Sequence, residues 1–359
     1  MPSGFTGPLP SSISMSSSSP KRSSRLRIWL LVVAFLVCAT VAAAFITVPV
    51  VAWLPGPIYD VIDQVEVGPD VEVYPPTGDH LVLTVAGTNR LSLLEAIGYG
   101  ISPRADLISL SSVRRPGETA EEYRTRNLQS MDVSVHTSIV VALDRLGYEL
   151  DDAEIVVSGI LEDVPADSDL DPGDVILGVE DTTLQRADDL VEYIAGRQPG
   201  DTLKLEIMRD DETIDAKVEL TSREDDPSAA MLGITVQEMV DPPLDIDIET
   251  DKVGGTSAGL MNAIAIMDLL SPGNMVNGHT VAGTGTLDLD GNVGTIGGIR
   301  QKVVAAKEVG AEFVIVPRGN LEEAETASVD IKLVPVDTID DALDYLAALP
   351  PTQAATSPD

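Results

Sequence analysis

A serine lies between glycines at the kind of turn that a nucleophile needs. Ser257 stands in Gly254-Gly255-Thr256-Ser257-Ala258-Gly259-Leu260, between a strand-like run at 244–250 and a helical run at 260–270. A serine at such a turn projects clear of neighbouring side chains, and backbone N–H groups at a helix start face a developing oxyanion. The alternative is a turn of small residues that only packs closely. The turn alone does not decide between the two.

Histidine is a poor candidate for the base that would activate this serine. The residues from Gly255 to Gly259 fit the G-x-S-x-G pattern of α/β-hydrolases, in which an acid and then a histidine follow the serine. The only histidine after Ser257 is His279, and it follows the next helix too closely to leave room for the intervening strands and acid. A Ser-His esterase is therefore the less favoured alternative.

An amine can replace histidine if its pKa is low enough. Lys302 follows the paired glycines Gly297 and Gly298 by four residues, on a helical run that begins at about Ile299 and is rich in valine and alanine. Burial among apolar groups lowers the pKa of a lysine from about 10.4, which frees the neutral amine to act as a general base. A lone lysine is usually a solvated charge, so Lys302 gains its weight from the pattern around it.

Composition excludes several classes of function. The chain has 359 residues, with 23 Lys and Arg against 58 Asp and Glu, and a formal net charge of -35. Such a surface repels phosphate backbones, so we expect no nucleic-acid partner. Cys38 is the only cysteine, which excludes an intrachain disulfide and a thiolate metal cluster. We expect no metal and no cofactor.

The N-terminal part reads as a membrane anchor. Residues 1–27 are predicted to be a disordered tail that ends in a basic cluster, and residues 28–54 carry no charge. At ~1.5 Å per residue, this run is long enough to cross a hydrocarbon core of roughly 30 Å. The basic flank places the tail in the cytoplasm and the rest of the chain outside the cell membrane. The alternative is a signal peptide cleaved at 42–44.

Residues 55–145 contain short β-type runs and a helical pattern at 132–146, and no chemistry can be assigned to 55–130. We treat 55–145 as an extracytoplasmic β/α region of unclear role. Residues 146–222 then carry an ordered set of motifs. In chain order these are a strand-like run at 155–161, Val164-Pro-Ala166, Leu170-Asp-Pro-Gly-Asp-Val-Ile-Leu177, a short helix at about 188–196 and a predicted hairpin at 202–220.

This order of motifs resembles a bacterial PDZ domain, which we place at 146–222. The resemblance implies that an extended peptide, often a C-terminus, is taken up as an added strand beside the groove helix. The loop that receives the peptide carboxylate would precede the first strand, at Leu146, Gly147 and Tyr148. The alternative is that Gly147 only caps the preceding helix. A polar linker at 223–231 follows, then a second domain at 232–349 and a frayed tail at 350–359.

The order of motifs in the second domain resembles the proteolytic domain of Lon proteases. After the serine turn come Val281-Ala-Gly-Thr284-Gly-Thr, then Gly294-Thr-Ile-Gly297-Gly298, Lys302 and Phe313-Val-Ile-Val-Pro317. The resemblance implies a Ser-Lys dyad, with Ser257 as nucleophile and Lys302 as base. Thr284 matches a threonine that helps orient the lysine. Gly255, Thr256 and Thr284 are the expected supporting and oxyanion-side positions. The sequence departs from the family at two points, since Thr256 stands where the family has proline and Gly254-Gly255 stands where soluble Lon has Asp-Gly.

Anchor, PDZ and Lon-type domain together resemble the PDZ-containing, membrane-anchored Lon-like serine proteases. The resemblance implies an α+β chain whose proteolytic domain has a ribosomal-protein-S5-domain-2-like α/β fold. The printed sequence has no G-x-x-x-x-G-K-[ST] motif. The expected activity is an ATP-independent serine endopeptidase that cleaves extracytoplasmic proteins and peptides. Lon-type domains tend to assemble into rings, so a homo-oligomeric ring is an expected partner state. The alternative is a PDZ adaptor that binds peptides without cutting them.

Overall fold

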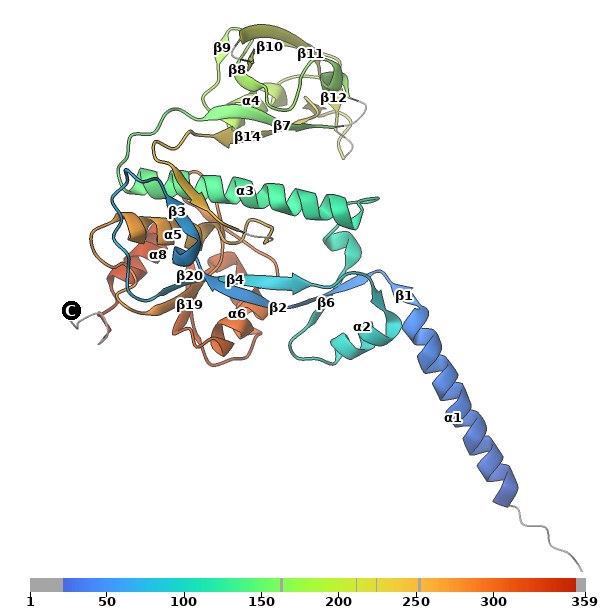
Figure 1. Ribbon diagram of the computed structural model, residues 1–359. Helices are drawn as coiled ribbons and strands as arrows, with labels where there is room; N and C mark the ends of the chain where they lie inside the picture. The colour runs from blue at the N-terminus through green and yellow to red at the C-terminus, as the bar shows by residue number, and fades with distance from the viewer. Residues whose placement is uncertain (1–21, 162–163, 211, 224, 251–252, 353–359) are drawn as a thin grey trace, which may run out of the picture.

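A computed structural model describes residues 22–161, 164–210, 212–223, 225–250 and 253–352. Within these residues the chain forms a long N-terminal helix, a body built on one mixed sheet and a second sheet domain that sits beside helix α3 (Figure 1). The tails predicted at 1–27 and 350–359 lie largely outside the described residues. The body carries both residues of the predicted dyad.

The N-terminal helix α1 (Arg22–Phe45) ends earlier than the predicted span at 28–54. Its apolar window, Leu26–Phe45, is covered by no other described part of the chain, and it alone among the described helices is long and apolar enough to cross a membrane. A signal sequence passes the same test. The chain then enters strand because Pro49 has no N–H for a helix and its β-branched neighbours favour extended backbone. The expected helix end at residue 54 was wrong.

The body is organised on a six-stranded sheet in the order β20-β19-β16-β4-β2-β6. Strands β20, β19, β16 and β4 run parallel, and β2 pairs antiparallel with β4 and β6. The strands are β2 (Val50–Asp60), β4 (Asp79–Gly87), β6 (Asp106–Ser109), β16 (Thr280–Gly283), β19 (Phe313–Pro317) and β20 (Lys332–Val336). Strands β4, β6 and the second half of β2 come from the region at 55–145, whose role the sequence did not indicate. That region is part of the body.

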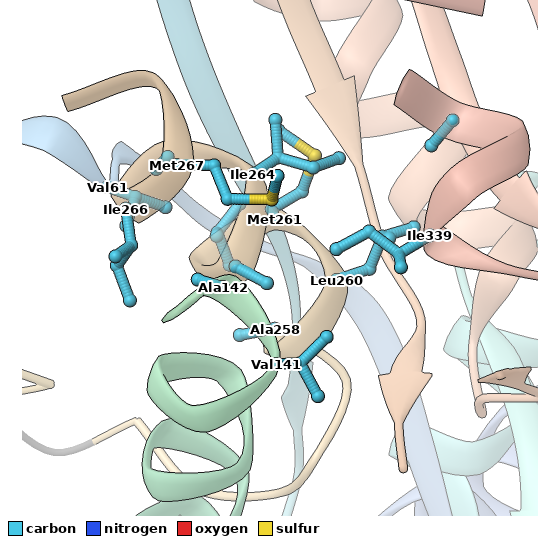
Figure 2. Close-up of a cluster of buried hydrophobic side chains, with 14 of the residues drawn as sticks. Val61, Val141, Ala142, Ala258, Leu260, Met261, Ile264, Ile266, Met267 and Ile339 are labelled. Atoms are coloured by element: carbon cyan, nitrogen blue, oxygen red, sulfur yellow. The ribbon is translucent and has the colours of Figure 1, made fainter. Parts of the chain in front are cut away.

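Helices cover both faces of this sheet. One face packs against α5 (Gly259–Leu270) and α8 (Ile339–Ala347), with α3 (Ala120–Arg145) packed on α5, and the other face packs against α6 (Ile299–Glu308) and α7 (Leu321–Glu325). Every residue of α5 is buried, which fits a helix that is apolar all round. Figure 2 shows Val141 and Ala142 of α3 close to Ala258, which precedes α5, whereas Met261 of α5 faces the sheet and would meet a Cβ at Gly283 of β16.

The alternation of side chains along the strands produces these two cores. In β19, Phe313 and Ile315 face the α5 side, whereas Val314 and Val316 face the α6 side. Such continuous apolar runs are expected for parallel strands that are covered on both faces. Helices α5 and α6 therefore lie on opposite faces of one sheet, and residues at their N-terminal ends can meet only at an edge where the strands end.

The second sheet has the order β11-β10-β8-β7-β14 and packs against helix α4 (Ala187–Ala195). Its strands are β7 (Glu154–Ile160), β8 (Val175–Val179), β9 (Thr182–Thr183), β10 (Thr202–Arg209), β11 (Glu212–Glu219) and β14 (Ile234–Met239). The expected boundaries at 222, 223–231 and 232 differ from this arrangement, because β14 pairs with β7. The sheet domain therefore continues to Met239.

The remaining elements are short. They are η1 (Ile62–Gln64), η2 (Leu110–Ser112), η3 (Pro165–Ser168), η4 (Arg318–Asn320), β1 (Thr47–Val48), β3 (Val65–Val67), β5 (Leu91–Ser92), α2 (Leu93–Gly100), β12 (Thr221–Ser222), β13 (Ala230–Met231), β15 (Ile246–Ile248), β17 (Thr286–Leu287) and β18 (Val293–Gly294). The predicted strand at 244–250 corresponds to β15, which pairs with β3.

Candidate active site

The serine turn is held against helix α3 by its two glycines. Gly255 has φ +99°, a backbone conformation that side chains strongly disfavour, and its N–H donates to the carbonyl oxygen of Asn127 over 2.8 Å. A Cβ at Gly254 would lie 2.9 Å from Cβ of Asn127. Both glycines are therefore required for the close approach that fixes the turn before Ser257. No motif in the sequence marks Asn127 as the partner of this turn.

A second pair of glycines positions the lysine. Gly298 caps α6 with φ +68°, and its carbonyl oxygen accepts the N–H of Lys302 over 3.1 Å. A Cβ at Gly297 would lie 2.5 Å from the indole ring of Trp53 on β2. The glycine pair thus lets α6 begin against Trp53, and the first turns of the helix carry Lys302 to the edge of the sheet.

Ser257, Lys302 and Thr284 meet at this edge. Nζ of Lys302 lies 2.6 Å from Oγ of Ser257 and 2.8 Å from Oγ1 of Thr284. The hydroxyl of Thr284 donates to the carbonyl oxygen of Ser257 over 3.0 Å, so its oxygen is left to accept from the amine. Gly285, next in the chain, donates its N–H to the same carbonyl oxygen over 2.9 Å. The three predicted residues form one connected hydrogen-bonded group.

Burial sets the charge of the lysine. Lys302 is 1% exposed, and burial lowers its pKa from 10.5 to about 7. No carboxylate of the described residues forms an ion pair with its Nζ. A buried amine without a counter-ion gives up its proton because the charged form loses its hydration. The amine is therefore available as a base near neutral pH, with a hydroxyl in hydrogen-bonding reach.

A cavity of about 530 Å³ opens onto this group. The described lining residues include three basic side chains and no acidic one, in a chain dominated by acids. They are Trp53, Val85, Gly87, Thr88, Asn89, Arg114, Ala120, Tyr123, Arg124, Asn127, Leu128, Gly254, Gly255, Thr256, Ser257, Thr286, Thr295, Ile296, Gly297 and Lys302. The cleft is large enough for several residues of a peptide.

Candidate oxyanion donors lie beside the serine. Within the part of the chain that the structure describes, the N–H groups of Thr256, Ser257 and Ala258 have no hydrogen-bond acceptor.

His279, the base of the Ser-His alternative, is not placed to activate Ser257. The ring of His279 lies 2.8 Å from a carboxylate oxygen of Glu312 and 2.9 Å from the carbonyl oxygen of Pro350, and it does not line the cleft.

The structure does not bring the predicted peptide loop to a groove. Leu146 caps α3, Gly147 has φ +81°, and the N–H of Tyr148 donates to the carbonyl oxygen of Leu143 over 3.0 Å. These contacts close a helix in the way typical of a C-terminal glycine. None of the three residues lines the cavity of the second sheet domain. The alternative reading of Gly147 as a helix cap describes the structure.

The groove of the second sheet domain lies instead between α4 and β14. It encloses about 370 Å³. Its walls include Leu190 and Ile194 of α4 and the segment from Leu232 to Ile234 that leads into β14. β14 is an edge strand, since it pairs only with β7 among the described strands. The run Leu232-Gly233-Ile234, which precedes an alternating strand, could have indicated this groove in the sequence. The prediction placed that run in the domain at 232–349.

Comparison with known proteins identifies two domain families in the chain. Residues 131–220 match the PDZ domain family, and residues 249–348 match the Lon protease (S16) C-terminal proteolytic domain. The chain is 28% identical to the Lon protease of Campylobacter concisus over 144 residues. This aligned stretch covers 39% of this chain and 18% of that protein. It is 37% identical over 117 residues to Lon protease 2 of Bacillus subtilis, which covers 31% of this chain and 21% of that protein.

The chain thus spans about a fifth of the length of these relatives. Among solved structures, the PDZ domain of the SdrC-like protein of Listeria monocytogenes is 26% identical, with a TM-score of 0.22, over 23% of this chain and 85% of that one. The serine turn, Thr284 and Lys302 all fall inside the range that matches the Lon domain. The chain therefore carries a PDZ domain and a proteolytic domain of the Lon protease type.

Proposed function

We propose that the protein is a serine endopeptidase that works through a Ser257-Lys302 dyad. The observation that carries the proposal is the 2.6 Å approach of a buried, uncompensated Lys302 amine to the hydroxyl of Ser257. The match to the proteolytic domain of Lon supports the same reaction class. The side chains needed for acyl transfer, namely a nucleophile, a base and an orienting hydroxyl, are in contact.

The first half of the reaction forms an acyl-enzyme. The neutral amine of Lys302 takes the proton of the Ser257 hydroxyl as its oxygen attacks the substrate carbonyl carbon. The carbonyl oxygen becomes an oxyanion, which the unpaired N–H groups of Ser257 and its neighbours stabilise. The C–N bond then breaks, and the lysine ammonium gives its proton to the departing amine. This leaves an ester on Ser257 and a neutral lysine.

The second half reverses these roles with water. Lys302 takes a proton from a water molecule that attacks the ester, and it returns that proton to the oxygen of Ser257 as the ester bond breaks. Thr284 accepts an N–H of the amine, which points the nitrogen lone pair at the Ser257 hydroxyl. The cycle consumes one water and no nucleotide, so the chemistry itself is ATP-independent.

The PDZ domain would supply substrate binding. The free edge of β14 offers unpaired backbone groups for an added peptide strand, and the apolar groove beside α4 offers space for its side chains. The short segment Leu232-Gly233-Ile234 lines this groove, and we propose that it binds the peptide carboxylate. It replaces the loop at 146–148 in this role.

The helix α1 would anchor the protein in the cell membrane. It is long and apolar, and the basic cluster that ends at Arg27 lies at the N-terminal end of its apolar window. With the basic flank in the cytoplasm, the PDZ and proteolytic domains act on the outer side. Substrates would then be extracytoplasmic proteins and peptides.

An active-site probe tests the dyad. A peptide boronate or a fluorophosphonate should attach to Ser257 in the wild type and fail to attach in both Ser257→Ala and Lys302→Ala. Lys307→Ala is the matched control, because Lys307 lies on the same helix and does not line the cleft. An adaptor that does not cut would bind peptides and resist the probe in every form. A Ser-His esterase would lose its labelling in His279→Ala, which we expect to react like the wild type.

A further inference from the structure

Helix α2 exposes an apolar face that nothing in the described chain covers. Leu94, Ile97 and Ile101, at its C-terminal boundary, are 42%, 55% and 83% exposed, and Leu93 is 36% exposed. At about 100° of rotation per residue, these four side chains fall within roughly 100° of the helix circumference. Ala96 lies outside this arc and packs into a small core with residues of β2 and β5. The outward face is therefore a single apolar stripe.

This stripe is unusual for the molecule. Outside α1 and the residue that follows it, eleven large apolar side chains of the described residues are exposed, and five of them lie between Leu93 and Leu107. Leu107 of β6 extends the stripe, since a Cβ at Gly100 would lie 3.4 Å from its side chain. Apolar side chains gathered in this way on an acidic protein mark an interaction surface.

The stripe begins where α1 ends. The N–H of Leu93 donates to the carbonyl oxygen of Ile46 over 2.8 Å, and β1 pairs with β5 so that Thr47 lies opposite Ser92. Figure 1 shows α2 beside the end of α1 that joins the body. A membrane surface at the end of α1 would therefore pass along α2.

We propose that α2 lies in the interface of the bilayer that α1 spans, with Leu94, Ile97 and Ile101 inserted at the acyl boundary. The inference rests on the proposed membrane anchoring. An amphipathic helix binds an interface through its buried apolar area and through attraction between basic residues and anionic lipids. The only charged residue of α2 is Glu95, which is bound in the capping box with Ser92. Binding should therefore depend on apolar insertion and not on lipid charge.

The alternative occupant of this face is a second copy of the chain. The bilayer is favoured because the stripe begins at the end of the apolar helix α1, where the N–H of Leu93 donates to the carbonyl oxygen of Ile46. A copy that covered α2 would need to fit between the body and the membrane surface. The experiment below separates the two.

The test uses the full chain, carrying Cys38→Ala, in phosphatidylcholine vesicles. An environment-sensitive label is attached to a single cysteine at one of three positions, through Ile101→Cys, Leu36→Cys in α1 or Val309→Cys, an exposed position after α6. We expect phospholipids with doxyl-labelled chains to quench the labels at 36 and 101, and iodide to quench only the label at 309. The pattern should stay unchanged when a fraction of the lipid is phosphatidylglycerol.

Each other outcome overturns the proposal. If iodide quenches the label at 101 while lipid quenches the label at 36, the anchor stands and the interfacial helix is wrong. If iodide quenches both, the anchor itself is wrong, and α2 does not lie in a membrane. A label at 101 that is protected from both quenchers and becomes exposed to iodide as the protein is diluted in lipid indicates a second copy on this face.

Discussion

The two ends of helix α5 hold buried ionisable groups in opposite ways. At its C-terminal end, the carboxylate of Asp268 is fully buried and accepts the N–H of Met275 over 2.7 Å, and its Oδ2 lies 3.0 Å from Nε2 of His80. Beside its N-terminal end, the amine of Lys302 meets only the hydroxyls of Ser257 and Thr284. Both groups are buried away from water. The carboxylate of Asp268 has hydrogen-bond partners in His80 and Met275, whereas the amine of Lys302 has no counter-ion among the described residues.

This difference separates structure from reactivity. A buried charge with a full set of partners ties elements together, here α5 to β4. A buried amine without a counter-ion becomes neutral and acquires a lone pair that can take a proton.

Removal of either dyad side chain should abolish cleavage. We expect Ser257→Ala, Lys302→Met and Lys302→Arg each to reduce kcat for an unfolded protein substrate by at least about 10³-fold. Lys302→Arg is the sharpest of these changes, because a guanidinium stays protonated and cannot act as a base. Lys307→Met should cleave at the wild-type rate. An active Lys302→Arg enzyme would show that catalysis does not need a neutral amine at position 302, and it would contradict the proposed role of Lys302 as a base.

Loss of the partnered carboxylate should affect stability. Asp268→Ala leaves the imidazole of His80 and the N–H of Met275 without a buried acceptor, which costs about 3–5 kcal/mol of unfolding free energy. Asp268→Asn keeps an acceptor oxygen and should cost clearly less. Urea denaturation in detergent, followed by intrinsic fluorescence, measures both. Equal stability of Asp268→Ala and the wild type would mean that the pair does not hold α5 to β4.

Replacement of the Lys302 amine by an apolar side chain should raise the free energy of unfolding, whereas Asp268→Ala should lower it. The folded pKa of Lys302 is lowered to about 7, so the unfolded state binds more protons between pH ~7 and ~10.5, and wild-type stability rises with pH in that window. The cost of burying the amine is about 5 kcal/mol at pH 6 and about 2 kcal/mol at pH 9. The stability difference between Lys302→Met and the wild type should therefore shrink by about 3 kcal/mol from pH 6 to pH 9. A constant difference would mean that Lys302 is not neutralised by burial.

The pH dependence of cleavage should report the same amine. Because the protonated amine cannot act as a base, kcat/KM should fall about tenfold per pH unit below pH ~7 and level off above it. The profile is measured with a peptide that has no ionisable side chains. A midpoint near pH 10 would place Lys302 in contact with water and contradict its burial.

Thr284 should have the smallest effect, because it acts on the amine and does not react. We expect Thr284→Val to lower kcat by about tenfold with little change in KM, since the amine loses the oxygen that orients it. Thr284→Ser should restore most of the rate because it returns the hydroxyl. Failure of serine to rescue would assign the role of Thr284 to packing at the end of β16.

Local sequence patterns predicted the starts of the two helices beside the dyad to within one residue. The helix predicted at 260–270 is α5, which begins at Gly259, and the helix predicted from Ile299 is α6. Both begin at glycine-containing turns, whose signals are local in sequence. The contact between Ser257 and Lys302 has the geometry that a Ser-Lys dyad requires, and their catalytic roles stay predictions for the experiments above.

Long-range pairing was beyond local patterns. β4 pairs with β16, so His80 lies opposite Val281, and a period-two pattern does not say which strand will be the partner. The same limit separated β14 from the PDZ sheet and hid the contact of Trp53 with Gly297. The end of α1 was missed for another reason. The residues from Ile46 to Leu54 are apolar whether they lie in lipid or in a sheet, so hydropathy alone extended the helix.

The pairing of β4 with β16 also bears on the synthesis of the protein. About 200 residues separate the paired positions His80 and Val281, and the whole PDZ domain lies between them, so this part of the sheet closes late in folding. Until α6 packs on that sheet, Lys302 remains in water with a pKa near 10.4 and stays protonated. In the proposed mechanism, the nascent chain therefore emerges with the nucleophile Ser257 but without a base. If the proposed dyad is correct, proteolysis can begin only when the fold is complete, and the unfinished chain is protected from its own active site.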